Sequence, residues 1–390
     1  MSPVRAEIVV DLGALRANVR RLTDLVGPEV QMMSVVKADG YGHGMLACAQ
    51  AAREAGAQWL GVATLEEALR LREGGDTGRI LSWLSGPGED YAAAVERGID
   101  VTAYTRAELD EIVRGAWTAG RPAAVQLKVD TGLSRGGSTL QAWPGLVEAA
   151  REAEIAGGIS VTGIWSHFAC SDEPEHPEND RQEQAFRAAL AVAEAAGLRP
   201  QVRHLANSAA AILRPSSRFD LVRCGIATYG LDPAPGVTSP VGLVPVMTVR
   251  AGLAVVKPIA AGAGVSYGHT WVAEHDTTVG VVPVGYGEGI LRHAGNTAEV
   301  WSAGRRRPVR GRICMDQFVV DLDADDLPTG TEVVLFGPGF DGEPTAQDWA
   351  EACDTINYEI VTRIGGRLHR RYLDRRTSAA LTGAAEGVTR

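Results

Sequence analysis

The sequence is poor in the features that mark secreted proteins. It has five cysteines, an odd number without a CxxC pair, at Cys48, Cys170, Cys224, Cys314 and Cys353. This usage favours reduced thiols in a cytoplasm over a disulfide framework or a zinc knuckle. The N-terminal segment has no apolar core of signal-peptide length, and no run approaches the length that spans a bilayer. We therefore expect a cytoplasmic protein that does not enter a membrane.

An excess of positive charge is also missing. The 38 Lys and Arg residues are outnumbered by 48 Asp and Glu residues, which gives a formal net charge of -10. Such a protein is a poor candidate for nucleic-acid binding, which depends on neutralising phosphates. The sequence also lacks a GxxxxGKS/T loop, a GxGxxG after a strand, and the HxxxH or HxH spacing of metal sites. Nucleotide-dependent enzymes therefore lose support, and we expect no metal.

The chain does have the composition of an ordinary globular protein, with 45% apolar and 22% charged residues. Up to about residue 230, short β-branched runs alternate with longer amphipathic runs, such as those at 65–75 and 106–117. Eight runs have the length and bounds of buried parallel strands. They lie at 30–38, 59–64, 79–85, 101–105, 124–131, 161–168, 202–208 and 219–230. Eight strands that alternate with helices suggest a (β/α)8 barrel.

The pattern changes after Pro233. Residues 238–335 read as strands and turns broken by Gly and Pro, followed by helices near Gln347 and Thr355 and a short strand at 369–373. We therefore predict an α/β fold: a (β/α)8 TIM-type barrel over residues 1–235, then a mainly β C-terminal domain over 236–390. Whether the first strand packs on the second domain stays open. The small, polar tail from Thr377 is expected to be frayed.

The most informative segment is VVKADGYGHG, at residues 35–44. It places Lys37 at the C-terminal end of the first strong strand, where barrel enzymes keep their chemistry. Burial there lowers the pKa of a lysine and favours its attack on a carbonyl. The glycines allow a tight turn, and Tyr41 offers a hydroxyl to a phosphate. An isolated lysine at a strand end more often reaches out to solvent, so the whole segment carries the interpretation.

This segment resembles the cofactor-lysine segment of the alanine racemases, and the resemblance extends in order across nearly the whole chain. KVDTGLSR (128–135) is similar to the segment with a lysine often found carbamylated, here Lys128, and a substrate-facing arginine, here Arg135. WSHFACSDE, HLANSAA and VRCGIATYG resemble the segments around the pyridine ring and the cofactor phosphate. The resemblance implies pyridoxal 5'-phosphate as cofactor. The implied cofactor-binding residues are Lys37, Tyr41, His167, Asn207, Ser208, Arg223, Gly225, Ile226 and Tyr358.

The second domain continues the resemblance. VSYGHTW, GYGEG and GRICMDQ are similar to the racemase segments that supply a second catalytic base and line the substrate pocket. Two positions depart from the family without removing a reacting group: Glu288 stands where aspartate is common, and Cys224 where proline is common. The implied catalytic residues are Lys37 and Tyr267, and the implied substrate-binding residues are Arg135, Tyr286, Met315 and Asp316.

These residue types suit the inversion of an amino-acid α-carbon. Pyridoxal phosphate supplies the electron sink, and Lys37 and Tyr267 supply one base on each face. Arginine does not give up its proton, so Arg223 leaves the pyridine nitrogen largely unprotonated and transamination is suppressed. The resemblance further implies a homodimer in which Tyr267 comes from the partner subunit. We therefore expect an alanine racemase that supplies D-alanine for cell-wall peptidoglycan.

Three alternatives remain at this point. A serine or broad-specificity racemase differs only in pocket volume, which is worth only about 1–3 kcal/mol in discrimination. A decarboxylase of the same barrel-plus-β class is expected to pair the pyridine nitrogen with a carboxylate and to bind phosphate with a glycine triplet, neither of which the sequence has. A non-catalytic pyridoxal-phosphate-binding protein is expected to be a barrel alone, without the domain that contributes Tyr267.

Overall fold

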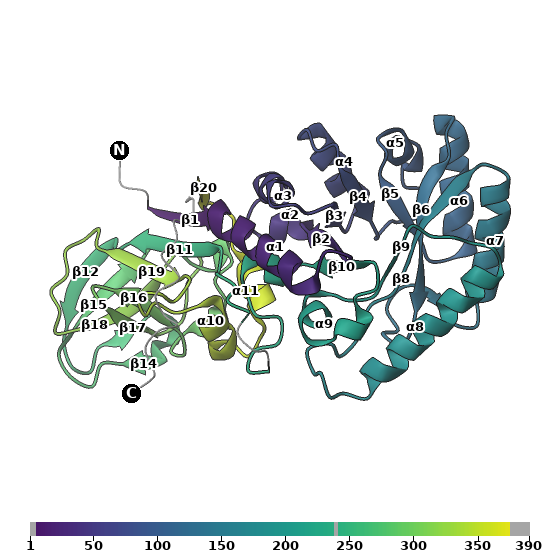
Figure 1. Ribbon diagram of the computed structural model, residues 1–390. Coiled ribbons are helices and arrows are strands. Elements are labelled where there is room, and N and C mark those ends of the chain that lie inside the picture. The colour runs from purple at the N-terminus through teal and green to yellow at the C-terminus, as the bar shows by residue number, and fades with distance from the viewer. Residues whose placement is uncertain (1–4, 238–240, 375–390) are drawn as a thin grey trace. The chain divides into compact units, whose positions relative to one another are not determined.

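The computed structural model describes residues 5–237 and 241–374, so the tail from Thr377 lies outside the described residues. The chain divides into two compact units (Figure 1). Of the described residues, we call 18–228, 232–237 and 241–243 the barrel unit, and 5–17, 229–231 and 244–374 the β unit. The boundary falls within helix α1 (Leu12–Val26). The predicted barrel domain ran to residue 235 and left the packing of the first strand open; by their contacts, residues 5–17 and 229–231 group with the β unit.

The barrel unit contains a sheet of eight parallel strands in the order β10-β2-β3-β4-β5-β6-β8-β9. The strands are β2 (Gln31–Val35), β3 (Trp59–Val62), β4 (Arg79–Ser82), β5 (Asp100–Ala103), β6 (Ala123–Asp130), β8 (Ile159–Trp165), β9 (Val202–His204) and β10 (Leu221–Cys224). A two-residue strand, β7 (Ser138–Thr139), pairs with β6. All eight predicted strands are confirmed. They are buried on both faces, which explains their short, nearly continuous apolar runs.

The two ends of this sheet meet, so the barrel is nearly closed. Asp220 N donates to Arg203 O at 3.0 Å, and Arg223 N donates to Ala206 O at 3.0 Å. These bonds tie the segment around β10 to the segment that follows β9. The predicted fold class, a (β/α)8 barrel followed by a mainly β domain, is confirmed. In a closed barrel all eight strands direct their carboxyl ends to one face, where their loops meet.

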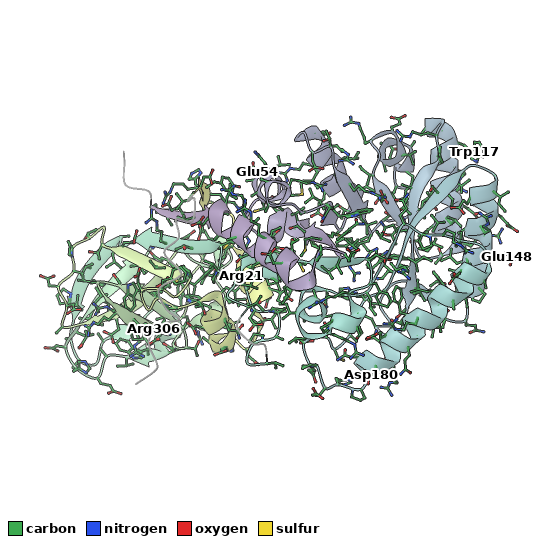
Figure 2. All side chains as sticks on the ribbon, in the orientation of Figure 1. Arg21, Glu54, Trp117, Glu148, Asp180 and Arg306 are labelled. Atoms are coloured by element: carbon green, nitrogen blue, oxygen red, sulfur yellow. The ribbon has the colours of Figure 1, made fainter. Side chains whose placement is uncertain are left out.

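Helices cover the outside of the barrel (Figure 1). They are α3 (Met45–Glu54), α4 (Leu65–Glu73), α5 (Tyr91–Glu96), α6 (Arg106–Ala119), α7 (Trp143–Ile155), α8 (Glu178–Ala195) and α9 (Ser208–Leu213). The helices predicted at 65–75 and 106–117 are confirmed as α4 and α6. Each begins at a threonine N-cap, Thr64 or Thr105, whose side chain and a glutamate three residues later satisfy each other's backbone amides. Their outward positions include charged residues such as Glu54, Glu148 and Asp180, and also the exposed Trp117 (Figure 2).

The β unit is built on a nine-stranded sheet in the order β12-β15-β18-β17-β16-β19-β11-β1-β20. Its strands are β1 (Ala6–Asp11), β11 (Met247–Gly252), β12 (Val255–Ile259), β15 (Thr277–Val282), β16 (Glu299–Ser302), β17 (Arg305–Arg310), β18 (Phe318–Asp323), β19 (Glu332–Phe336) and β20 (His369–Leu373). A separate pair joins β13 (Gly264–Val265) to β14 (Trp271–Val272). The predicted helices near Gln347 and Thr355 are α10 (Ala346–Ala352) and α11 (Asn357–Arg363).

The first strand answers the question that the sequence left open. Strand β1 pairs antiparallel with β11 and parallel with β20, so β1 is an inner strand of the β unit. Buried Glu7 reinforces this position because it accepts hydrogen bonds from Arg250 of β11 and Arg371 of β20. Burial raises the pKa of Glu7, but these two guanidinium groups more than offset it, and the pKa is lowered overall. Within the described residues, no helix is long and apolar enough to span a bilayer.

Candidate active site

Lys37 lies just beyond β2 and is half-buried. Its Nζ atom is 5.8 Å from the centroid of the Trp83 ring. Burial lowers the pKa of Lys37, and the charges of Arg135 and Arg223 lower it further against the opposing effect of Glu67. A lower pKa increases the fraction of neutral amine, the form that attacks a carbonyl. The side chain predicted to bind the cofactor therefore has the environment that this chemistry requires.

The chain after Lys37 turns in the left-handed sense. The φ angles of Ala38, Asp39, Gly40 and Tyr41 are 53°, 52°, 64° and 52°. Each non-glycine residue in this conformation costs about 1–2 kcal/mol, so the turn needs support from elsewhere. Ala38 N donates to Glu67 Oε1 at 2.6 Å, and Asp39 Oδ1 accepts from Met45 N at 3.0 Å. The strained turn carries the chain from Lys37 to a buried Tyr41 within four residues.

The Tyr41 hydroxyl lies against the backbone that follows β10. A Cβ atom on Gly225 would lie 2.3 Å from Tyr41 Oη, so only glycine fits there. Ser208 Oγ accepts hydrogen bonds from Gly225 N at 2.9 Å and Ala227 N at 3.4 Å. Burial strongly raises the pKa of Tyr41, so its phenol stays protonated and can donate. The two amides orient the Ser208 hydroxyl, and it and the Tyr41 hydroxyl both lie at the backbone around Gly225, as donors suited to a phosphate.

Two further predicted phosphate residues belong to the same region. Asn207 is the N-cap of α9, where its Oδ1 atom accepts from Ala210 N at 3.1 Å. Its Nδ2 atom donates to Ser171 Oγ at 2.8 Å. Ile226 is fully buried and follows Gly225 directly. The sequence neighbours of Ser208 and Gly225 thus form one continuous structural feature at the ends of β9 and β10.

Arg223 on β10 is a buried cation whose contacts are neutral acceptors. Its Nη1 atom donates to His204 Nδ1 at 2.9 Å. Its Nη2 atom donates to the carbonyl oxygens of Ser166 (2.8 Å) and Leu205 (3.0 Å), and lies 3.1 Å from His167 Nδ1. Burial lowers the pKa of Arg223 to about 9, so it remains charged at neutral pH. Burial and the Arg223 charge hold the pKa of His167 well below its usual value, so His167 is neutral and accepts.

Lys128 and Arg135 lie on the β6 strand and the loop after it. Lys128 Nζ is 4.6 Å from the centroid of the Trp165 ring and 5.1 Å from that of Tyr104. Burial lowers the pKa of Lys128 to about 8, with Arg223 and Arg135 adding to the effect. Arg135 itself is exposed. Lys128 therefore has an appreciable neutral fraction near physiological pH.

The other predicted site residues belong to the β unit. Tyr267 begins a short 3-10 turn (Tyr267–His269) and is 69% exposed, so its ring is available to a partner group. The preceding Ser266 has a φ of 60° and donates from Oγ to Arg312 O at 2.6 Å, which fixes the start of the turn. Tyr286 N donates to Cys314 O at 3.0 Å. This bond joins the loop of Tyr286 to the loop that carries Met315 and Asp316.

Glu288 explains how these two loops are held together. The side chain is fully buried, and Oε2 accepts from Gly285 N at 2.9 Å. Oε1 accepts from Arg367 Nε at 2.5 Å, and Arg367 Nη2 donates to Asp316 Oδ1 at 2.6 Å. Glu288, which stands where aspartate is common in the family, therefore links the Tyr286 turn to Asp316 through Arg367. Tyr358, the remaining predicted phosphate residue, lies on α11.

Comparison with known proteins identifies the family to which these segments belong. Residues 10–233 match the family model "Alanine racemase, N-terminal domain", and residues 246–372 match "Alanine racemase, C-terminal domain". The chain belongs to the alanine racemase family. The activity that the sequence predicted, isomerisation of alanine, is thus confirmed at the level of the family.

Individual relatives resemble the chain over almost its whole length. An alanine racemase of Salinispora arenicola is 53% identical over 369 residues, covering 94% of this chain and 98% of the relative. The solved alanine racemase of Streptomyces lavendulae has 51% identity and a TM-score of 0.94, covering 96% of this chain and 98% of that one. The alanine racemase of Streptomyces coelicolor A3(2) has 53% identity and a TM-score of 0.93, covering 95% and 98%. The barrel and the β domain are therefore those of the solved racemases.

The structure also assigns neighbours that the sequence did not single out. The rings of Trp83, Tyr104 and Trp165 surround the two lysines at the barrel mouth. Glu67 accepts from Ala38 N and Ala63 N in addition to capping α4. The local sequence around these residues does not indicate such contacts, because each contact joins segments that are distant in the sequence. The exception is Glu67, since the spacing of Thr64 and Glu67 is that of a capping box at the start of α4.

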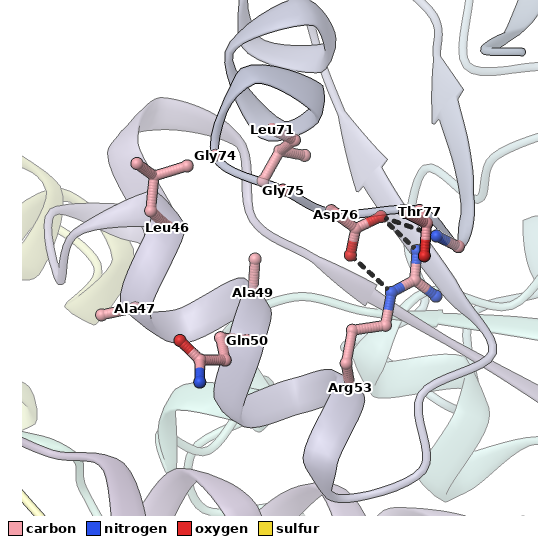
Figure 3. Close-up of a pocket in the computed structure, with 11 residues that line it drawn as sticks. Leu46, Ala47, Ala49, Gln50, Arg53, Leu71, Gly74, Gly75, Asp76 and Thr77 are labelled. Carbon is pink, nitrogen blue, oxygen red and sulfur yellow. Dashed lines mark hydrogen bonds and ion pairs between the residues drawn. The ribbon is translucent and has the colours of Figure 1, made fainter. Parts of the chain in front are cut away.

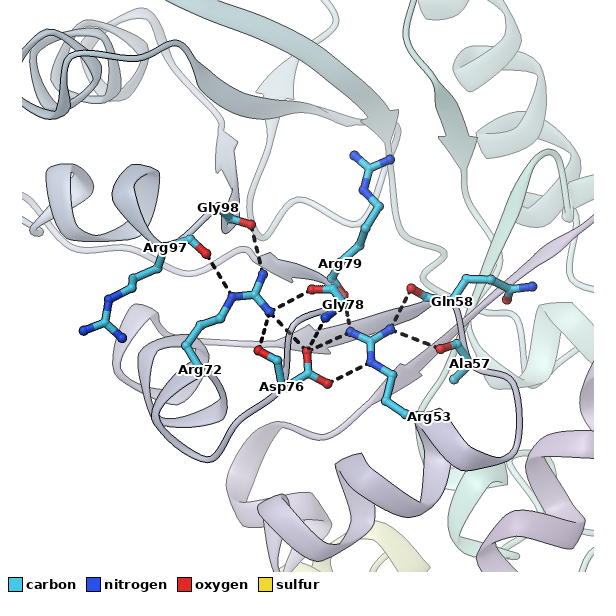
Figure 4. A network of polar contacts seen from close by, with 9 residues as sticks. All are labelled: Arg53, Ala57, Gln58, Arg72, Asp76, Gly78, Arg79, Arg97 and Gly98. Carbon is cyan, nitrogen blue, oxygen red and sulfur yellow. Dashed lines mark hydrogen bonds and ion pairs between the residues drawn. The ribbon is translucent and has the colours of Figure 1, made fainter.

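A different cavity, of about 640 Å³, opens on the outside of the barrel between α3 and α4 (Figure 3). Its charged residues Arg53 and Asp76 are already paired, with Nε to Oδ2 at 2.9 Å. Asp76 Oδ1 also accepts from Arg72 Nη1 at 3.1 Å (Figure 4). These groups stabilise the loop before β4, so we assign no site there. The described residues also contain no group of three or more His, Cys, Asp or Glu side chains that could hold a metal ion.

The close approach of Tyr41 to Gly225 leads to a test. Gly225→Ala should lower the thermal midpoint of the protein, by an overpacking cost of about 1–3 kcal/mol, and weaken pyridoxal phosphate binding. Adding Tyr41→Phe removes the clashing oxygen and should recover part of the stability without recovering cofactor affinity. Gly145→Ala is the matched control, because a Cβ there meets no atom within 4 Å. If Gly225→Ala behaves like this control, the Tyr41–Gly225 cradle has no role in binding.

Proposed function

We propose that the chain interconverts L-alanine and D-alanine in the cytoplasm with pyridoxal 5'-phosphate bound through Lys37, and so supplies D-alanine for peptidoglycan. The observation that carries the proposal is that two unusual groups lie at the same end of the barrel. Lys37 has a lowered pKa, and buried Arg223 donates its hydrogen bonds to neutral acceptors. The first group suits capture of a carbonyl cofactor. The second suits a ring nitrogen that must accept a hydrogen bond without receiving a proton.

The residues present fit this cofactor. The donor set of Tyr41, Ser208 and the Gly225 backbone suits a phosphate, and the space beside Gly225 is one that a Cβ would fill. When bound, pyridoxal phosphate supplies the electron sink that makes the α-proton of an amino acid removable. We assign the phosphate to Tyr41, Asn207, Ser208, Gly225, Ile226 and Tyr358, and the pyridine nitrogen to Arg223 with His167 behind it. The substrate we assign to Arg135, Tyr286, Met315 and Asp316.

Racemisation needs a proton carrier on each face of the α-carbon. Lys37 Nζ, once freed from the cofactor, takes or returns the proton on one face. Tyr267 Oη does the same on the other face. A phenol is a weak base at neutral pH, so it needs a cation to stabilise its ionised form, and Arg135 is the exposed cation we assign to this role. Because Arg223 keeps its own proton, it would hold the ring nitrogen by a donated hydrogen bond without protonating it, which would favour return of the proton to the α-carbon by Lys37 or Tyr267.

The assignment of Lys37 is open to an unusually sharp test, because the chain contains only three lysines, Lys37, Lys128 and Lys257. Purified protein should be yellow, and borohydride should attach the cofactor to the peptide that contains Lys37. Lys37→Ala should lose this labelling and the racemisation of L-alanine in a chiral assay, whereas Lys257→Ala, on the exposed strand β12, should retain both. Label on another lysine contradicts the assignment. A panel that includes L-serine tests whether the enzyme is strict for alanine.

We further propose a homodimer in which Tyr267 reaches the active site of the partner subunit. In a two-fold dimer each chain would give its barrel to one site and its β unit to the other. Lys37→Ala and Tyr267→Phe dimers should each be nearly inactive. Random reassociation of equal amounts gives roughly half mixed dimers, each with one intact site, and therefore about a quarter of wild-type activity. Mixtures that have not exchanged subunits serve as the control. Tagged mixed dimers that remain inactive would place both bases in one chain.

Lys128 is proposed to be carbamylated. Its pKa of about 8 leaves neutral amine available to carbon dioxide, and the neighbouring charges of Arg223 and Arg135 favour the anionic product. Protein equilibrated with 13C-bicarbonate should show one carbamate carbon signal that disappears in Lys128→Ala and persists in Lys257→Ala. Absence of the signal from wild-type protein means that Lys128 stays an amine and acts as a cation.

A further inference from the structure

A row of hydrogen-bonded, buried polar side chains extends from Arg223 across the barrel interior. Arg223 Nη1 donates to His204 Nδ1 at 2.9 Å, and His204 Nε2 lies 2.7 Å from Gln126 Oε1. Gln126 Nε2 then donates to Asp100 Oδ2 at 3.3 Å. Each of these residues is at most 5% exposed, and they come from four strands, β10, β9, β6 and β5. Buried polar groups are costly unless they are paired, so this row must be compensated throughout its length.

The backbone of β8 departs from regular geometry where it lies beside this row. The pairing of β6 with β8 shifts after Val125, so that Thr162 stands as an extra residue on β8. Its Oγ1 atom donates to Asp100 Oδ2 at 2.5 Å. The next residue, Gly163, lies opposite Gln126, and a Cβ atom there would be 2.7 Å from Gln126 Oε1. The bulge turns the Thr162 side chain toward Asp100, and the glycine after it leaves room for the Gln126 side chain. The backbone is therefore adapted to this row of polar side chains.

The carboxylate at the far end sets the direction of every hydrogen bond in the row. Asp100 is ion-paired with Arg79 at 3.2 Å and therefore only accepts. Gln126 must turn its amide nitrogen toward Asp100, which leaves its oxygen facing His204. The imidazole must then carry its proton on Nε2, so Nδ1 is a lone pair that accepts from Arg223. This neutral tautomer fits the burial and the nearby Arg223 charge, which hold the pKa of His204 well below its usual value.

The side chains stacked on the row keep its members in line. The rings of Trp165 and His204 are parallel within 5°, with centroids 5.6 Å apart. The Arg223 Cζ atom is 4.8 Å from the centroid of the same Trp165 ring. The imidazole therefore cannot tilt without disturbing the guanidinium that it accepts from.

We propose that Asp100 and Gln126 are positioning residues that act through His204 to hold Arg223 as a protonated donor toward the cofactor's ring nitrogen. This inference rests on the proposed function. Gln126 has a second role as an insulator, because an amide does not pass a proton from His204 to Asp100. The carboxylate thus orients the arginine while staying two neutral groups away from it, and the ring nitrogen is not given a route to protonation.

The measurable consequence is the fate of the α-proton. In racemisation the proton returns to the α-carbon. In transamination it is delivered to the aldehyde carbon of the cofactor instead, water then releases pyruvate, and the amino group stays on the cofactor. A ring nitrogen that gains a proton prolongs the life of the carbanion and favours the second outcome. Misdirected hydrogen bonds at Arg223 should therefore raise the ratio of pyruvate formed to alanine racemised.

Two variants and a matched control test the proposal in full-length protein loaded with pyridoxal phosphate. Asp100→Asn removes the fixed acceptor, so that Gln126 and His204 are free to reverse. The double variant Asp100→Asn/Gln126→Glu conserves the total charge but moves the carboxylate next to His204. It also reverses the hydrogen bond between positions 100 and 126, because the new amide at position 100 must then donate to the new carboxylate at position 126. Asp220→Asn is the control, since Asp220 pairs with exposed Arg203 and precedes β10, outside the row. Each protein is assayed for pyruvate and for D-alanine from L-alanine.

A second readout does not depend on activity. In spectra of 15N-histidine-labelled protein, with the His204 signal identified by its loss in His204→Asn, wild type and Asp220→Asn should show the neutral ring protonated on Nε2. Asp100→Asn should show a mixture of tautomers, and the double variant should shift His204 toward imidazolium. The ratio of pyruvate to racemised alanine should rise about 3- to 30-fold in both variants, the range for residues that act through a network.

The outcomes separate this inference from the proposed function. If folded Asp100→Asn and the double variant match Asp220→Asn in both the histidine spectrum and the product ratio, Asp100 and Gln126 do not position Arg223. If the histidine spectrum changes while the product ratio does not, the row exists but does not control the reaction, and the proposal is equally overturned. A wild-type protein that fails to racemise alanine refutes the proposed function, whatever the spectra show.

Discussion

The structure of the barrel unit depends on the burial of one guanidinium group. Arg223 is 5% exposed and cannot shed its charge at neutral pH, so each of its hydrogen atoms needs an acceptor inside the protein. Its acceptors come from the segments that end β8 and β9, and Arg223 itself lies on β10. Strands β8 and β9 are paired neighbours, and β10, at the other end of the sheet, lies beside them because the sheet closes on itself. The arginine that we assign to the cofactor therefore also joins the two ends of the sheet through its side chain.

That constraint extends to the surrounding side chains. A buried cation favours neutral histidines beside it, and the pKa values of His167 and His204 are both lowered by burial and by Arg223. Neutral imidazoles provide one acceptor nitrogen each, and the proton on the other nitrogen needs a partner of its own. For His204 that partner is Gln126, whose own partner is Asp100. One charge thus dictates the identity of residues on strands far from it in the sequence.

Much of the fold was readable from the sequence because it depends on local pattern. Eight short apolar runs bounded by turn residues predicted eight buried parallel strands, and all eight are present. Helices α4 and α6 were predicted from their amphipathic spacing, and the structure adds their threonine N-caps. The place of Lys37 at the carboxyl end of a strand was also predicted from local pattern, whereas Lys128 and Arg223 were assigned to the site only through the family resemblance. For the strands, the helices and Lys37, the deciding information lies within about ten neighbouring residues.

The features that were missed are those that two distant segments create together. No local pattern indicates that Ala38 and Asp39 adopt left-handed φ angles, since their support comes from Glu67 and Met45. The bulge at Thr162 exists only in the pairing of β6 with β8. The placement of strand β1 was left open because an apolar run does not indicate its pairing partners, which are β11 and β20. Register and pairing, rather than residue type, contain this information.

The cations gathered at the barrel mouth lower the pKa values of the lysines there, and they also reduce the stability of the folded protein. Lys128 has a pKa of about 8 in the folded protein against an ordinary 10.5, so between these values the unfolded chain binds more protons than the folded one. Stability contributed by this group therefore rises with pH across that window, and the penalty of the buried charge is present in full below pH 8. Carbamylation would remove the penalty by replacing the cation with an anion that Arg135 and Arg223 attract. A carbamate on Lys128 would thus stabilise the fold and balance the charge of the site through one covalent change.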